Sequence, residues 1–414
     1  MAKHTLDELK QWQALPLSIK LLMTKERIRA WVNEYGEDGV YISFSGGKDS
    51  TVLMDIIRND MGYDLPAVFV DVPTQYPELR EFAKKWDNVE ILKPKISFIK
   101  VCEKYGFPLI SKEVSECIYE AKKYLTRIET NETVLTDRQT DRQTDRQTDR
   151  QTVKGYWAYA DVAGIPRRQG AQDSEEYKNL KKGIIPNSSK FKYGKPVRIL
   201  QLEGKMPHKE KGVLTAEYSK KYDKSKYAFY LDAPFEVSHM CCKVMKKEPL
   251  HQYVARTGRN AITAQMADES MLRQSQWIRY GCNMYDAKYP ISNPMSFWLE
   301  NDVLEYIKTR NIEICSVYGD VVEDFGSLPD GQMHLSDYGL AEKQTKYKCT
   351  GCKRTGCMLC GFGAHLEKSP NRFEMLKETH PKMYDLLDVV KNNGVTFREA
   401  IDWSNEHGNL NIKY

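Results

Sequence analysis

The stretch that most constrains this chain is Tyr41–Ser50, which reads YISFSGGKDS. A short apolar run leads into two glycines, and the apolar spacing of residues 51–57 then favours a helix. A strand that turns sharply into a helix directs unpaired backbone N–H groups and the positive end of the helix dipole at one point. Because Gly46 and Gly47 lack Cβ, the backbone can turn tightly there and approach phosphate oxygens.

The side chains of the same stretch predict an anion site with further donors, namely the hydroxyls of Ser45 and Ser50 and the charge of Lys48. The stretch is not a Walker A loop. That pattern requires a glycine where this chain has Ile42, and Ser or Thr directly after the lysine, where it has Asp49.

Strand and helix signals alternate around the loop. Apolar runs at 67–71 and 89–92 predict strands, and the spacing in 17–35, 77–86 and 96–105 predicts helices. This alternation indicates an α/β fold, a Rossmann-like parallel sheet flanked by helices on both faces.

Ligands of such sheets lie beyond the carboxyl ends of the strands, where Ser45 and Asp71 both fall. Asp71 therefore either contacts a nucleotide or a Mg²⁺ ion, or caps the turn that follows its strand.

Composition indicates the compartment. The N-terminus has no apolar signal core and no run reaches membrane-spanning length, so we expect a cytoplasmic protein with no membrane partner. Four of the ten cysteines fall within 349–360, which in the cytoplasm indicates metal or redox ligands rather than disulfides.

Positive charge is concentrated in one segment. Residues 178–226 hold fourteen Lys or Arg against four Asp or Glu, and tyrosines are interleaved with them. The segment either binds a polyanion, such as nucleic acid or nucleotide phosphates, or is a solvated surface. It is also the predicted contact with a DNA-bound protein partner. It follows four Thr-Asp-Arg-Gln repeats within 136–152, to which we assign no catalytic role. Both belong to a predicted charged insertion, 113–226.

Several ordered motifs together resemble the phosphoadenosine phosphosulfate (PAPS) reductase family. They are the loop at 44–50, Val70-Asp71, Tyr76-Pro-Glu78, Cys241-Cys242 with Lys246, Ala267-Asp-Glu-Ser270 with Arg273, and the segment around Trp298. The resemblance implies the adenine nucleotide alpha-hydrolase-like fold and makes the loop a PP-loop, which holds the pyrophosphate of ATP. It also implies that Glu269 and Arg273 shape the substrate end.

The resemblance extends to a metal centre. Relatives that act on adenosine phosphosulfate hold a [4Fe–4S] cluster with a Cys-Cys pair and a distant Cys-x-x-Cys, which match Cys241, Cys242, Cys357 and Cys360. Four thiolates also suit zinc. A compact site in which Cys349 and Cys352 join residues 357 and 360 is the rival ligand set.

Two departures from the reductases favour a different reaction. No cysteine follows Cys360, whereas reductases need a catalytic cysteine near the C-terminus, and the lysine-containing loop is the form of ATP-using relatives such as the small subunit of sulfate adenylyltransferase. We therefore expect an enzyme of sulfur metabolism that binds ATP and Mg²⁺ and adenylylates a small sulfur-containing or oxyanion acceptor, releasing pyrophosphate. Lys48 and Asp49 are the predicted catalytic residues.

Two alternatives stay open: a sulfonucleotide reductase that uses an external thiol, and a nucleotide-binding regulator that acts with a DNA-bound partner. We also expect a homo-oligomer. The predicted organisation is N-terminal helices at 1–38, core halves at 39–112 and 227–310 on either side of the insertion, and a Cys-rich region at 311–414.

Overall fold

The computed structural model describes residues 2–137, 191–192, 195–210, 213–324 and 345–414. The chain divides into two compact units: the first comprises 1–97 and 244–358, the second 98–243 and 359–414. Most of the Thr-Asp-Arg-Gln repeats and the start of the basic segment, residues 138–190, lie outside the described residues.

The first unit is built on a six-stranded sheet with the order β10-β11-β9-β1-β2-β3. Neighbouring strands from β11 to β3 are parallel, and only the edge strand β10 runs antiparallel. The central strand places Ile42 opposite Ala67 on one side and Ile262 on the other. The strands are β1 (Val40–Phe44), β2 (Ala67–Val70), β3 (Val89–Leu92), β9 (Asn260–Ile262), β10 (Asn283–Met284) and β11 (Ile291–Ser292).

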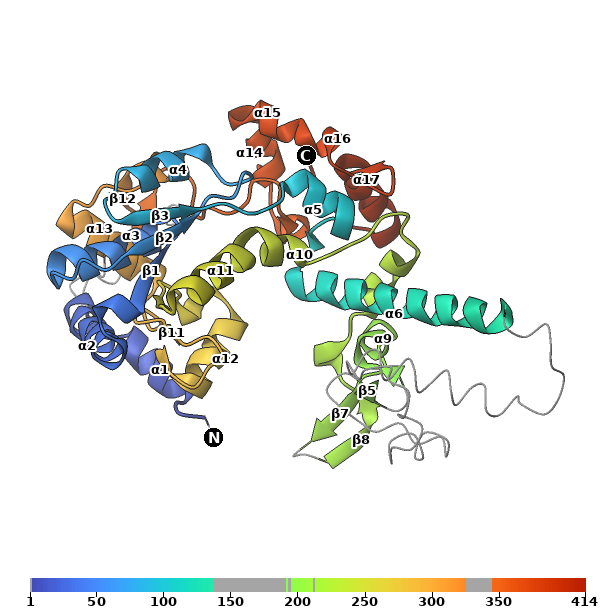
Figure 1. Cartoon of the computed structure of the whole chain (residues 1–414), viewed down its shortest axis with the longest axis horizontal. Helices are drawn as coiled ribbons and strands as arrows, with labels where there is room; N and C mark the ends of the chain where they lie inside the picture. Colours follow the sequence, from blue (N-terminus) through green and yellow to red (C-terminus); the bar gives the residue numbers. More distant parts are fainter. Residues whose placement is uncertain (1, 138–190, 193–194, 211–212, 325–344) are drawn as a thin grey trace, which may run out of the picture. The chain divides into compact units, whose positions relative to one another are not determined.

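Alternate residues of β1 pack against helices on opposite faces of the sheet, as the pleat requires. Val40, Ile42 and Phe44 join a large core with side chains from α2 (Leu17–Tyr35), α3 (Lys48–Asp55) and α13 (Glu300–Arg310). Tyr41 faces the other way, where its ring meets that of Tyr253 on α11 (Glu248–Thr257) at 4.9 Å. The predicted α/β fold, a mostly parallel sheet flanked by helices, is confirmed (Figure 1).

Local signals set several helix ends. The capping box of Thr5 and Glu8 opens α1 (Leu6–Gln13), Gly36 ends α2, and Pro77 begins α4 (Pro77–Lys84). Helix α3 begins at Lys48, earlier than the apolar spacing predicted, and continues as a π-helical turn over Ile56–Asp60. Helix α12 (Met271–Tyr280) and the antiparallel pair β12 (Val321–Glu323) and β13 (Tyr347–Cys349) complete the unit.

The second unit is mainly helical. Its helices are α5 (Phe98–Tyr105), α6 (Lys112–Asp137), α9 (Val197–Leu202), α10 (Met240–Cys242), α14 (Arg372–Thr379), α15 (Pro381–Tyr384), α16 (Leu386–Val389) and α17 (Phe397–Gly408). Short strands pair as β4 (Leu109–Ile110) with β14 (Gly361–Phe362), β5 (Phe191–Lys192) with β6 (Lys195–Pro196), β7 (Pro207–Glu210) with β8 (Val213–Tyr218), and β15 (Lys391–Asn392) with β16 (Val395–Thr396).

Residues 225–232, where we expected the strand–helix alternation to resume, form a 3₁₀ helix with Tyr227 and Tyr230 buried. Two cations of the basic segment are paired within this unit, because Lys224 contacts Glu113 at 2.8 Å and Arg198 contacts Glu116 at 2.8 Å. None of the helices described here has the length and apolar character needed to cross a lipid bilayer.

Candidate active site

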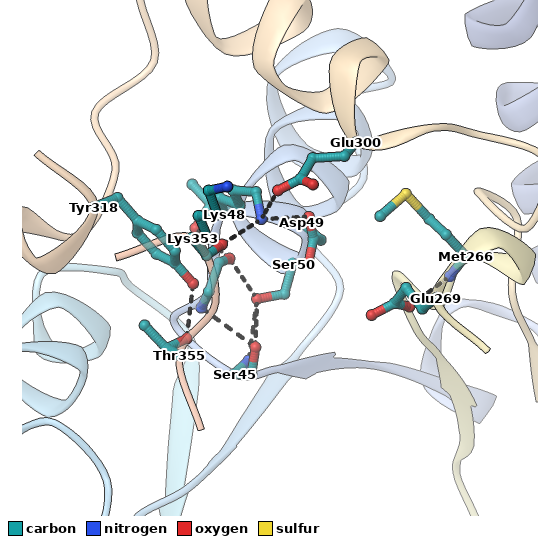
Figure 2. Close-up of polar contacts among 12 residues, drawn as sticks. Ser45, Lys48, Asp49, Ser50, Met266, Glu269, Glu300, Tyr318, Lys353 and Thr355 are labelled. Carbon is teal, nitrogen blue, oxygen red and sulfur yellow. Dashed lines mark hydrogen bonds and ion pairs between the residues drawn. The ribbon is translucent and has the colours of Figure 1, made fainter. Parts of the chain in front are cut away.

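The loop between β1 and α3 is shaped by its own hydroxyl groups. Gly46 has a φ of +70°, and a Cβ at that position would lie 3.1 Å from the carbonyl oxygen of Leu79. The Ser50 hydroxyl donates to the Gly47 carbonyl oxygen at 2.9 Å and accepts from the Ser45 N–H at 3.2 Å. The Gly47 N–H in turn donates to the Ser45 hydroxyl at 3.2 Å. The turn predicted from the sequence is therefore present, and its serines fix its conformation (Figure 2).

A cavity of about 310 Å³ opens at this loop. Of the residues that the sequence assigned to the nucleotide or substrate, seven line it: Ser45, Gly47, Lys48, Asp49, Ser50, Glu269 and Arg273. Further parts of the chain contribute to the wall: residues 263–268, the start of α13, Tyr318 and residues 354–355. The tertiary structure thus brings residues from widely separated parts of the sequence to the carboxyl end of β1.

Lys48 is almost completely buried, and its ammonium group is held by oxygen atoms. The Nζ atom donates to the Lys353 carbonyl oxygen at 3.1 Å and lies 3.2 Å from a carboxylate oxygen of Glu300. It also sits 5.6 Å from the centre of the Tyr318 ring (Figure 2). A fixed cation at the first turn of α3 adds to the positive end of the helix dipole, which favours a bound anion.

Asp49 presents a buried carboxylate oxygen toward this region. Its Oδ1 has no hydrogen-bond donor among the described residues, and the nearest cation is the Lys48 ammonium at 3.7 Å. Burial raises the pKa of Asp49, and Glu300 adds to this effect, whereas Lys48, Arg354 and Arg273 act in the opposite direction. A buried carboxylate oxygen without a hydrogen-bond donor is a suitable ligand for Mg²⁺.

At the other end of the cavity, Arg273 and Glu269 form an ion pair on adjacent turns. Glu269 also accepts a hydrogen bond from the Met266 N–H at 3.0 Å, so it fixes the chain before α12 (Figure 2). Burial lowers the pKa of Arg273, and the neighbouring Arg354 lowers it further. Their assignment to the substrate end stays a prediction.

Two predicted nucleotide contacts lie outside this cavity wall. Asp71 is buried at the end of β2 and accepts a hydrogen bond from Arg80 Nε at 2.7 Å. Gly46 provides the turn without lining the cavity.

Sequence analysis gave no site role to the other residues of the wall, among them Glu300, Tyr318, Arg354 and Thr355. The Tyr318 and Thr355 hydroxyls are 2.7 Å apart, which joins the segment after α13 to the Cys-rich block. Arg354 and Thr355 lie between Cys352 and Cys357, and we had interpreted that block only as a source of metal ligands.

The cysteines proposed as metal ligands are distributed over both units. Cys241, Cys242 and Cys360 belong to the second unit, and Cys357 to the first. The hydrogen bond with Cys242 raises the pKa of Cys241, as do its burial and the nearby thiols of Cys360 and Cys102. Three of the predicted ligands therefore lie close together. Among the described residues, however, no group of three or more His, Cys, Asp or Glu side chains is arranged to hold a metal ion.

The rival cysteines, Cys349 and Cys352, belong to the first unit, which also holds the cavity. The Cys352 thiol is 3.8 Å from the Tyr76 hydroxyl. Burial raises the pKa of Cys349, and the charges of Lys48, Glu300 and Asp49 are close enough to influence it as well.

Comparison with protein families gives one match. The model of the phosphoadenosine phosphosulfate reductase domain matches residues 39–157 and 197–361, well over half of the chain. The match includes the 45–50 loop, the Cys-Cys pair, the segment before α12 and the Cys-rich block. No curated protein matches the sequence.

Proposed function

The chain belongs to the phosphoadenosine phosphosulfate reductase family, and from this premise we propose that it is an ATP-dependent adenylyltransferase of sulfur metabolism. ATP binds with Mg²⁺ at the 45–50 loop. An electron pair of the acceptor attacks the α-phosphorus, the bond from that phosphorus to the bridging oxygen breaks, and pyrophosphate leaves. No electron transfer is needed, and the products are adenylylated acceptor and pyrophosphate.

The observation that carries this proposal is the set of groups around Lys48. Gly47, the serines Ser45 and Ser50 and the buried Lys48 line one cavity, where their donors would stabilise the charge that develops on departing pyrophosphate. Asp49 would supply an oxygen ligand to the Mg²⁺ ion, whose charge would offset that of the phosphates. Among the described residues that line the cavity there is no cysteine, so the wall offers no thiol for attack on sulfur.

The decisive assay measures pyrophosphate and AMP release from ATP over a panel of oxyanion and thiol acceptors. Lys48→Met retains the aliphatic stem and removes the charge, and we expect turnover to fall by about 10²–10³-fold, as on removal of one transition-state donor. Lys84→Met is the matched control, because Lys84 is exposed on α4 and pairs with Glu81. Wild-type pyrophosphate release by Lys48→Met would refute the assignment.

A second candidate is reduction of a sulfonucleotide with an external thiol. It is supported by the family itself and by the described cavity wall, which contains no cysteine, so that the thiol would have to come from elsewhere. Release of sulfite from adenosine phosphosulfate or PAPS in the presence of a dithiol, without pyrophosphate release from ATP, would establish this reaction instead.

We also propose a [4Fe–4S] cluster, with zinc as the alternative metal, on Cys241, Cys242 and Cys360. Cys357 precedes Cys360 by three residues, so the chain itself keeps the two within about 11 Å, and it is the proposed fourth ligand. Anaerobic purification followed by iron, sulfide and zinc analysis tests this. Cys242→Ser should lose the metal, whereas Cys282→Ser, which alters a buried cysteine of the first unit, should retain it. Equal metal content in both variants would contradict the ligand assignment.

A further inference from the structure

A second cavity, of about 240 Å³, adjoins the first. The two share Ser43, Thr263 and Gln265, which form a common rim at the ends of β1 and β9. From this rim the second cavity follows the α11 face of the sheet. A molecule bound there would meet a nucleotide in the first cavity at the rim.

The two cavities differ in charge. Four acidic side chains line the first cavity (Asp49, Asp268, Glu269 and Glu300) together with three basic ones (Lys48, Arg273 and Arg354). The described wall of the second contains the basic residues Lys247, His251 and Arg259 and neither Asp nor Glu. The first therefore suits a phosphate chain with its metal ion, and the second suits an anion that binds without a metal.

Arg259 is held in a fixed orientation. Its Nε donates to the Asp38 carbonyl oxygen at 3.0 Å and its Nη1 donates to the Tyr253 hydroxyl at 3.1 Å. In the part of the chain that the structure describes, Nη2 has no protein acceptor. A pre-oriented guanidinium with a free donor is well suited to a carboxylate or another planar oxyanion.

The rest of the second cavity is apolar and aromatic. Leu250 and Val254 of α11 and Ile291 of β11 contribute aliphatic surface. The rings of His251 and Tyr289 stack with their centres 4.6 Å apart and an interplanar angle of 12°. This surface favours a ligand with a flat apolar body over a small inorganic ion such as sulfate.

The rim offers polar groups to whatever binds. Within the described residues, neither the Ser43 hydroxyl nor the Gln265 amide makes a side-chain hydrogen bond, and Gln265 is half-buried. Thr263 is occupied by its hydrogen bond with Asn293. Two polar groups without protein partners therefore stand where the contents of the two cavities would meet.

We propose that the second cavity binds the acceptor, and that the acceptor is a small organic anion with a flat apolar body. Its charged group pairs with Arg259 and His251, its body lies on α11, and its nucleophile is at the rim. This assignment rests on the proposed adenylyl transfer, since it places both reactants side by side and so gives the advantage of proximity.

The test uses benzoate as the probe and benzamide as its uncharged analogue, with binding to the full-length protein followed by ligand-observed NMR. Wild type should bind benzoate about tenfold more tightly than benzamide, because the amide lacks the charge that Arg259 pairs with. His251→Gln and Arg259→Gln should each weaken benzoate binding several-fold to tenfold. Arg256→Gln is the control, since Arg256 lies on α11 with His251, is exposed and pairs with Glu90.

Competition with a non-hydrolysable ATP analogue, α,β-methylene-ATP, separates this inference from the proposed function. If the analogue binds wild type but not Lys48→Met, and leaves benzoate binding unchanged, both are supported. Displacement of benzoate by the analogue would assign the second cavity to the nucleotide and overturn this inference alone. Benzoate binding that neither His251→Gln nor Arg259→Gln alters would also overturn this inference alone. Failure of the analogue to bind wild type would overturn the proposed function, whatever benzoate does.

Discussion

The buried ion pair between Lys20 and Asp302 is predicted to fix the position of a residue in the wall of the candidate active site. The Lys20 ammonium lies 2.6 Å from an Asp302 carboxylate oxygen, and the two residues are 1% and 8% exposed. The same carboxylate accepts from the Leu299 N–H at 2.6 Å at the start of α13. That first turn carries Glu300, which contacts Lys48. The pair therefore fixes the helix end that positions a group of the cavity.

Lys20→Met would leave Asp302 as a buried charge with only its capping hydrogen bond. Breaking a buried pair by removing one partner costs about 3–5 kcal/mol, and the remaining cap favours the lower end, about 3 kcal/mol. With a urea dependence of about 2 kcal/mol/M, the unfolding midpoint should fall by about 1.5 M. Lys20→Met/Asp302→Asn should recover most of this loss, because the neutral amide can still cap the helix and no unpaired charge remains buried.

Urea denaturation of wild type, both variants and the control Lys25→Met gives the measurement. Lys25 is on the same helix and contacts Asp60 at 2.7 Å, but Asp60 is also paired with Arg310, so its loss should cost only about 1 kcal/mol. Affinity for α,β-methylene-ATP should fall in Lys20→Met and recover in the double variant. A Lys20→Met protein within 1 kcal/mol of wild type, or a double variant no more stable than the single one, would refute this reasoning.

Two further predictions concern backbone shape and pH. Gly46→Ala should destabilise the protein more than Gly62→Ala. Both glycines have a positive φ, which costs an alanine about 1–2 kcal/mol, but at Gly46 the added Cβ would also press on the Leu79 carbonyl oxygen. Equal unfolding midpoints in urea would contradict this. Hydrogen bonds from Arg398 lower the pKa of Asp388 in the folded protein. The ionised pair therefore stabilises the fold at pH values above the ordinary carboxyl pKa of about 3.9, and this contribution is lost as the pH falls through the lowered pKa of the folded state. Asp388→Asn should therefore be less stable than wild type at pH 7, and the difference should shrink below about pH 4; a pH-independent difference would show that the pair has no such role.

Local patterns were sufficient for several elements and for the turn that follows β1. The apolar run before Gly46 predicted β1, the spacing of residues 17–35 predicted the ends of α2, and the glycine pair predicted the turn before α3. These features depend on neighbours within a few residues, which is why the sequence alone specifies them. The short 3₁₀ helix at 225–232 escaped prediction because its aromatic residues fit a strand pattern equally well.

The sequence by itself determined that a glycine turn, a lysine and two serines would stand at the end of a buried parallel strand. Only the tertiary structure decided what surrounds them: Glu300 and the Lys353 carbonyl oxygen contact the ammonium group, and Arg354 lies in the cavity wall. It also decided that Asp71 pairs with Arg80 and does not line the cavity. These contacts join residues hundreds of positions apart or depend on the direction of a side chain. Chain folding fixes both through the packing of whole elements, which no local pattern records.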